Sequence, residues 1–130
     1  MKNFTLVLSF TVVVSALSVV ALPSVRAEDA ACGEKGQPDC PLQGWMEKHM
    51  QGPSEKKDAK ALVGPLEKAA TFAPDPKWNE GDKGWAKIAK DGAAAAKAGN
   101  FEGAQQACKA CHKAWRSQYK KEFRKKPIAG

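Results

Sequence analysis

The stretch NFEGAQQACKACHKAWRSQYKKEFR, residues 100–124, decides the fold. Asn100 can cap a helix at its start, and Glu102 suits the positive end of the helix dipole. Apolar side chains then recur at steps of three or four, which is typical of the buried face of a helix: Phe101, Ala104, Cys108, Cys111, Trp115, Tyr119 and Phe123. The sequence therefore predicts one long amphipathic helix with two cysteines on its buried face.

The centre of this helix carries the run Cys-Lys-Ala-Cys-His at residues 108–112. Positions i, i+3 and i+4 of a helix lie on one face, so Cys108, Cys111 and His112 can all address one flat ligand. A C-x-x-C-H run is typical of covalent haem attachment, in which two thiols bind the vinyl groups and the imidazole binds the iron. We interpret the run as the site of one haem c.

Other chemistry also uses a C-x-x-C pair. A thioredoxin-like redox pair requires a βαβ pattern around the motif, and no strand pattern is visible here. A zinc site would need two further ligands from Cys32, Cys40 and His49. A structural disulfide between the two cysteines of the motif is the remaining alternative.

Residues 1–27 are interpreted as a secretory signal peptide. An apolar run from Phe4 to Leu22 follows a basic start, and Val25 and Ala27 fit the small-residue rule for cleavage. The run is also long enough for an uncleaved membrane anchor. We expect cleavage after residue 27, export to the periplasm and no membrane attachment of the mature chain.

Cleavage of 27 of the 130 residues leaves 103, which is the size of one small domain. Lys2 and Arg26 leave with the signal and no acidic residue does, so the net charge falls from +7 to +5. A basic chain can bind nucleic acid, acidic lipid or an acidic protein. Export argues against nucleic acid, and the charge alone does not choose between the others.

The mature chain begins with an irregular arm, residues 28–40, that is rich in Gly, Pro and Asp. Cys32 and Cys40 suit a local disulfide within this arm, because an exported chain meets an oxidising environment. Two unpaired thiols are the alternative. The helical domain is expected at 41–126, followed by a tail at 127–130.

Three further helices are expected before the long one, over residues 41–51, about 54–72 and about 82–98. Pro41 suits the first turn of the first helix, and Gly52-Pro53 is expected to end it. Ser54 can cap the second helix, which Gly64-Pro65 should kink or divide. Without strand patterns, the sequence predicts an all-α fold, a compact antiparallel four-helix bundle with covalent haem on its last helix.

A single C-x-x-C-H on the last helix of such a bundle resembles the class II c-type cytochromes, the cytochrome c-prime group and its low-spin relatives. After His112, two variable residues, the aromatic Trp115 and Arg116 are similar to the run found in that family. The resemblance implies that His112 is the proximal iron ligand. It also implies that the first helix meets the other face of the haem.

In low-spin members of the family a methionine of the first helix binds the iron, whereas in c-prime members an apolar residue leaves the iron five-coordinate. Met46 matches the family position and is the expected distal ligand. His49 and Met50 share its helix face and are the alternatives. Trp45 and Trp115 are expected to line the haem.

The family commonly has an arginine one turn before the distal position, and this chain has Leu42 there. A guanidinium can bind a carboxylate through two hydrogen bonds. Arg116 is therefore the first candidate to pair with the haem propionates and Arg124 the second, since they are the only arginines left after export.

The sequence thus predicts a periplasmic carrier of single electrons with His/Met-ligated haem, and not an enzyme. Its lysines are expected to steer it to an acidic redox protein. The resemblance also allows for a homodimer. The alternative function is a five-coordinate binder of NO or CO, like cytochrome c-prime.

Overall fold

The structure is a computed structural model that describes residues 31–128. Within this range all regular structure is helical and no strand is present, which confirms the predicted all-α class. The predicted signal peptide and the last two residues of the predicted tail lie outside the described range. No helix of the described part combines the length and the apolar composition that crossing a bilayer requires.

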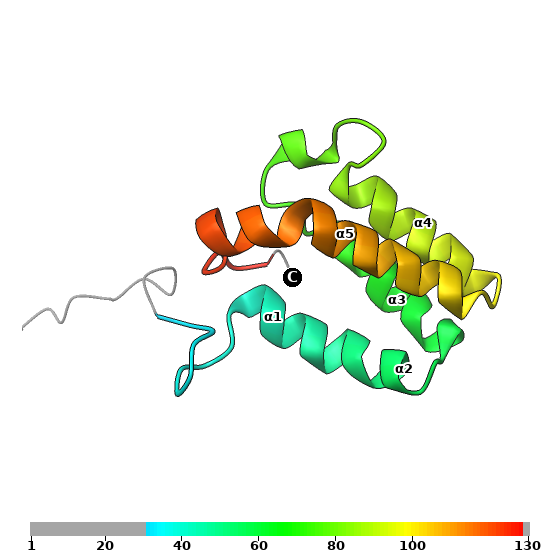
Figure 1. The fold of residues 1–130 in the computed structure, drawn as a ribbon, viewed down its shortest axis with the longest axis horizontal. Coiled ribbons are helices and arrows are strands. Elements are labelled where there is room, and N and C mark those ends of the chain that lie inside the picture. Colours follow the sequence, from blue (N-terminus) through cyan, green and yellow to red (C-terminus); the bar gives the residue numbers. More distant parts are fainter. Residues whose placement is uncertain (1–30, 129–130) are drawn as a thin grey trace, which may run out of the picture.

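The first helical run consists of α1 (Pro41–Met46), the π-helix η2 (Glu47–Gln51) and α2 (Gly52–Glu55), which follow one another without a break (Figure 1). The predicted helix end at Gly52-Pro53 is therefore wrong. Pro53 lies in the first turn of α2, where proline is tolerated. The run instead ends before Lys57, whose φ of 53° lies in the left-handed region.

The second predicted helix is the shorter α3 (Ala59–Ala69). Its cap is Asp58 rather than Ser54, since the Asp58 carboxylate accepts a hydrogen bond from the amide of Ala61 at 3.0 Å. Pro65 lies inside the helix, so the predicted division into two short helices is wrong. The helix is held by the burial of one face, which consists of Ala59, Leu62, Leu66 and Ala69.

The loop predicted after α3 contains the short 3₁₀-helix η3 (Pro76–Asn79), in which Trp78 is buried. α4 (Trp85–Lys97) follows, close to the expected bounds. Its buried face consists of Trp85, Ile88, Ala89, Gly92, Ala93 and Ala96. The small residues of this face decide how closely the next helix can approach.

α5 (Phe101–Glu122) is the predicted long helix, and Asn100 caps it by accepting a hydrogen bond from the amide of Gly103 at 2.9 Å. Figure 1 shows α4 and α5 side by side. A Cβ placed on Gly92 would lie 2.8 Å from the Cβ of Ala107, so the two helices touch closely there. Gly92 therefore serves helix packing.

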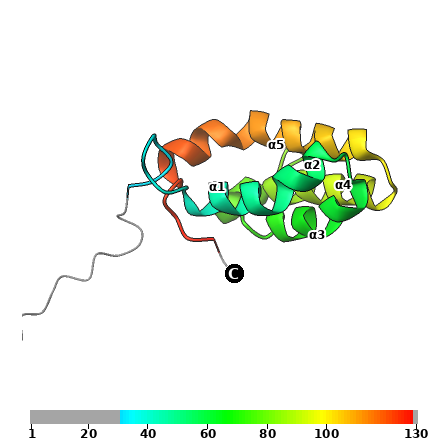
Figure 2. The ribbon, with the colours of Figure 1, turned by 90° about the horizontal axis from the view of Figure 1, so that it is seen from below.

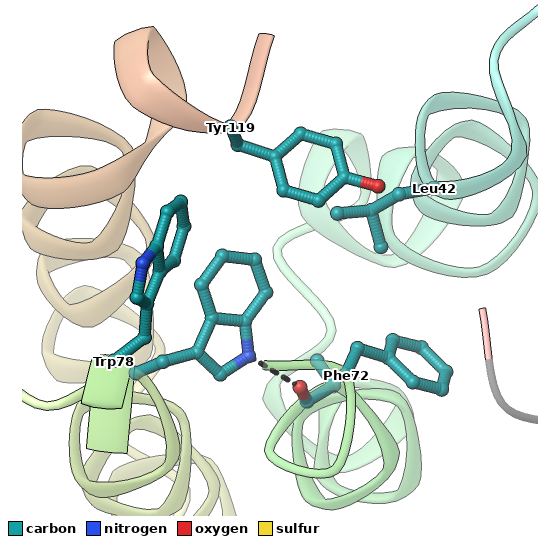
Figure 3. Packing of buried hydrophobic residues seen from close by; sticks show 6 residues of the cluster. Leu42, Phe72, Trp78 and Tyr119 are labelled. Carbon is teal, nitrogen blue, oxygen red and sulfur yellow. Dashed lines mark hydrogen bonds between the residues drawn. The ribbon is translucent and has the colours of Figure 1, made fainter. Parts of the chain in front are cut away.

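The buried residues form two clusters. The first joins α1, α3, α4 and α5, and Figure 3 shows its Tyr119 pointing toward Leu42 near Phe72 and Trp78. In this cluster the indole of Trp85 donates a hydrogen bond to the carbonyl of Ala69 at 2.7 Å. The second cluster consists of Leu62, Leu66, Ala93, Ala96 and Ala104.

Candidate functional site

A cavity of about 510 Å³ lies between the run α1–η2–α2 and α5. Figures 1 and 2 show these two parts of the chain facing one another. Residues of α3 and α4 close the side of the cavity between them, namely Leu66, Ala69, Trp85 and Ala89. Its volume falls in the range of about 300–1,000 Å³ that is usual for cofactor and small-molecule pockets.

The motif residues share the α5 wall of this cavity. Cys108 and Cys111 are free, half-buried thiols, and His112, one position further, lines the cavity with a more exposed side chain. Trp115 also lines it, and its indole is fixed by a hydrogen bond to the carbonyl of Lys83 at 3.0 Å. The structure thus brings together the α5 residues that the sequence assigned to haem.

The opposite wall contains both methionines of the first run. Met46 packs against the first core cluster, as do Cys111 and Trp115. Met50 packs against the second cluster, as does Cys108. Both methionines line the cavity, so two thioethers face the wall that carries the motif.

His49 and Trp45 are not among the residues that line the cavity. Their rings lie 4.9 Å apart between centroids, and the ring of Trp45 meets Phe72 edge-on at 4.8 Å. The structure therefore does not place Trp45, expected to line the haem, or His49, an alternative distal ligand, at this site.

The π-helix η2 explains this arrangement. A π-helix bonds each residue to the fifth along the chain, so it contains more residues per turn than an α-helix. His49 is thereby turned away from the face of Met46, and Gln51 is turned toward the cavity that it lines. π-Helical segments are rare in proteins, and those that occur are often found at functional sites.

The polar rim of the cavity was not found from the sequence. It comes from the first run and consists of Gln43, Glu47, Gln51 and Ser54. These side chains lie beside the apolar stripe rather than on it, and a pattern of apolar residues gives no signal for them. Only the assignment of a π-turn would have indicated Gln51.

Burial raises the pKa of the Cys111 thiol to about 11, and the neighbouring Cys108 adds to this effect. Burial also raises the pKa of Cys108. Redox-active cysteines usually have a lowered pKa, because the thiolate is the reactive form. The environment of these two thiols is thus the opposite of a thioredoxin-like site.

Burial lowers the pKa of His112, and the charge of Arg116 lowers it further. Both effects favour the neutral imidazole over the charged form. Neutral imidazole is the form that binds a metal.

Two arginines line the cavity, and their surroundings differ. Arg124 donates a hydrogen bond to the carbonyl of Cys32 and lies 3.5 Å from a carboxylate oxygen of Glu34. Arg116 is exposed and has no hydrogen bond or ion pair with the side chains that the structure describes. Arg116 is therefore the guanidinium with free donors at this cavity.

The other two cysteines, Cys32 and Cys40, are paired in a disulfide with Cα atoms 4.9 Å apart. They therefore cannot supply the missing ligands of a zinc site at the motif. Across residues 31–128, no group of three or more His, Cys, Asp or Glu side chains is arranged to hold a metal ion.

Comparisons of the chain with protein-family models, with curated proteins and with solved structures find no match.

Proposed function

We propose that the chain is a periplasmic c-type cytochrome, similar to the class II group, that carries single electrons through one covalently attached haem. The observation that carries the proposal is the composition of the cavity, since two free thiols, His112 and Met46 line the same 510 Å³ space. They come from two elements far apart in the sequence. The cavity in front of the C-x-x-C-H run supports the haem interpretation beyond the motif itself.

The residues of the cavity fit a haem. Cys108 and Cys111 would hold it by thioether bonds, His112 would bind the iron on one side and Met46 on the other. Arg116 would pair with the propionates, because Arg124 is already engaged. Haem bound here supplies an iron that accepts and releases one electron.

The helices have defined tasks in this proposal. α5 and the first run form the two sides of an antiparallel four-helix bundle that holds the haem between them, and α3 and α4 support both. The apolar walls would exclude water, and ligation by two side chains would leave no position for a substrate. The proposed protein is therefore a carrier and not an enzyme.

The partner is proposed to be an acidic redox protein. Residues 109–121 contain five basic residues and no acidic one, namely Lys109, Lys113, Arg116, Lys120 and Lys121. Their charge of +5 equals the net charge of residues 28–130. The charges of all other residues in that range therefore cancel. The positive charge is thus concentrated on the helix that carries the motif, where it would steer an anionic partner.

A five-coordinate binder of NO or CO is the second candidate. It requires that no side chain binds the distal face of the iron. The position of Met46 in the cavity wall favours the carrier over this candidate. Mixing the ferrous protein with CO separates them, because rapid binding without displacement of a ligand would support the gas binder.

The experiment that tests the proposal is expression of the full chain in cells equipped for cytochrome maturation. We expect an exported protein that gives a pyridine haemochrome spectrum and carries the mass of one haem after denaturation. The double variant Cys108→Ser/Cys111→Ser should lose the covalent haem. The matched control is Cys32→Ser/Cys40→Ser, which removes the other cysteine pair and should keep it. A colourless wild-type protein would refute the proposal.

A further inference from the structure

The disulfide between Cys32 and Cys40 closes a short loop ahead of α1. Within it the amide of Gly33 donates a hydrogen bond to the carbonyl of Pro38 at 2.7 Å, and that of Gln37 donates to the carbonyl of Glu34 at 2.9 Å. The loop therefore has its own internal bonds. Residues 32–40 are called the disulfide loop below.

Arg124 joins this loop to the chain beyond the end of α5. One nitrogen of its guanidinium donates to the carbonyl of Cys32, and another lies 3.5 Å from the Glu34 carboxylate. The Arg124 side chain is 28% exposed and the Glu34 side chain 68%, so water screens the ion pair strongly, and the hydrogen bond to the Cys32 carbonyl is the contact that holds the loop. Hydrogen bonds from a charged donor are the stronger kind, and this one joins residues 92 positions apart.

The same residues form part of the cavity wall. Gly33 and Cys40 from the loop line the cavity, and so does Arg124. Gly33 has a φ of +76°, and a Cβ added to it would lie 2.8 Å from both the Arg124 guanidinium and the Cys40 sulfur. The disulfide loop and the Arg124 side chain are thus packed together at one end of the cavity.

We propose that the disulfide loop is an end wall of the cavity and that Arg124 is the positioning residue that holds it closed. The loop, held in this way, limits the entry of small molecules to the cavity. Either of two changes should release it: loss of the Arg124 side chain, or opening of the Cys32–Cys40 bond. The part of the proposal that concerns access to a haem rests on the proposed function, whereas the attachment of the loop does not.

The first measurement reports attachment and needs no haem. Lys35 is exposed within the disulfide loop, and trypsin cuts after it faster when the loop unfolds locally. We expect Arg124→Gln to speed this cut about tenfold, the order expected when a charge-assisted hydrogen bond that holds a closed state is lost. Lys125→Gln is the matched control. It removes the neighbouring positive charge, which makes no hydrogen bond or ion pair with the described residues of the loop, and should leave the rate unchanged.

The second measurement reports access in the haem-loaded full chain. CO association is measured in the Met46→Ala background, so that the expected distal thioether does not compete. Adding Arg124→Gln, or Cys32→Ser/Cys40→Ser, should raise the association rate by about tenfold, and adding Lys125→Gln should not. The unfolding temperature of each variant is recorded, because general loosening would lower it in step with the rates.

The outcomes separate the two proposals. Equal trypsin rates in wild type and Arg124→Gln would show that Arg124 does not hold the loop and would overturn the inference. A faster cut with unchanged CO association would also overturn it, because the loop would then not be a wall. A colourless protein would refute the haem, while the trypsin rates would still decide whether Arg124 holds the loop.

Discussion

Met46 directly precedes the π-helix η2, and Met50 lies within it. Both side chains line the cavity, yet their surroundings differ. Met46 packs with the cluster that contains Cys111, the residue next to His112. Met50 packs with the cluster that contains Cys108, one turn earlier on α5. Met46 therefore shares its cluster with the chain neighbour of His112, whereas Met50 shares its cluster with Cys108, and a thioether suits either role because it also fills apolar space.

On the proposed function, the variant Met46→Ala should convert a low-spin spectrum of the purified haem-loaded protein to a high-spin one. It should also lower the reduction potential by on the order of 100 mV, because a thioether favours the reduced iron. Optical spectra and a redox titration measure both effects. The controls are Met50→Ala and His49→Ala, which should stay low-spin. A spin change in Met50→Ala, with none in Met46→Ala, would exchange the roles of the two methionines.

Tyr119 is the one tyrosine of the chain, so phenolate absorbance reports a single group. Its side chain is 9% exposed at the cavity wall, and burial raises its pKa above the ordinary 10.0. Below pH 10 the phenol is neutral in both the folded and the unfolded chain, so its contribution to stability is complete. Above that pH the unfolded chain ionises first, and this contribution is lost as the pH rises through the folded pKa.

Ultraviolet difference titration of the folded protein should therefore show a phenolate midpoint above 10. The same titration in denaturant should give the ordinary value and provides the reference. A folded midpoint at or below the denatured one would mean that Tyr119 is solvated and does not form part of the wall.

At the scale of elements, the contact between α4 and α5 depends on the absence of a side chain at Gly92. A Cβ there would lie 2.8 Å from the Cβ of Ala107, which is closer than two such atoms can approach. Alanine is the better helix former by about 1 kcal/mol, whereas overpacking costs about 1–3 kcal/mol. The steric cost is the larger, because the neighbouring atom belongs to a helix and not to a flexible side chain.

Gly92→Ala should consequently lower the free energy of unfolding by about 1 kcal/mol, measured by urea denaturation. Gly44→Ala in α1 is the matched control. Its added Cβ would meet Asp39 at an ordinary 3.4 Å, so the better helix propensity should stabilise the protein by roughly 0.5–1 kcal/mol. Stabilisation by both substitutions would show that α4 and α5 are not in close contact.

The sequence predicted the buried face of a helix best where the apolar residues keep the α-helical period without interruption. The spacing of three and four residues along α5 correctly joined Cys108, Cys111 and Trp115 on one face, because the helix stays regular throughout. In the first run, the same α-helical period predicted the wrong face for His49, which follows Met46. There the change to π-turns rotates every later residue, so His49 leaves the face that an α-helix would give it.

The helix boundaries failed for a related reason. Proline is tolerated in the first turn of a segment, so Gly52-Pro53 did not end the run, and the buried face of α3 held that helix together through Pro65. Local propensity is overridden where tertiary packing supplies more free energy. The cavity itself depends on how separate elements meet, and this cannot be seen from one helix at a time.

At the scale of the whole molecule, the positive charge is unevenly distributed along the chain. Residues 109–121 carry five basic side chains on α5, and the α4–α5 turn lies at the other end of that helix. From residue 101 to residue 113 a helix rises about 18 Å. Exposed charges separated by that distance are screened from one another at an ionic strength of 0.1 M, where the Debye length is about 10 Å. The cavity should therefore present a local positive potential to an approaching partner.

If the proposed haem is bound, oxidation of the ferrous protein by two small complexes of opposite charge measures this potential. The rate with the anion hexacyanoferrate(III) should fall as salt is added, and the rate with a cationic cobalt(III) complex should rise. Lys113→Glu should reduce both slopes, because it changes the local charge by two units. Lys97→Glu, exposed at the end of α4, makes the same change in net charge and should leave the slopes near those of wild type. Equal effects of the two variants would show that only the net charge matters, and would remove α5 as the docking face for an acidic partner.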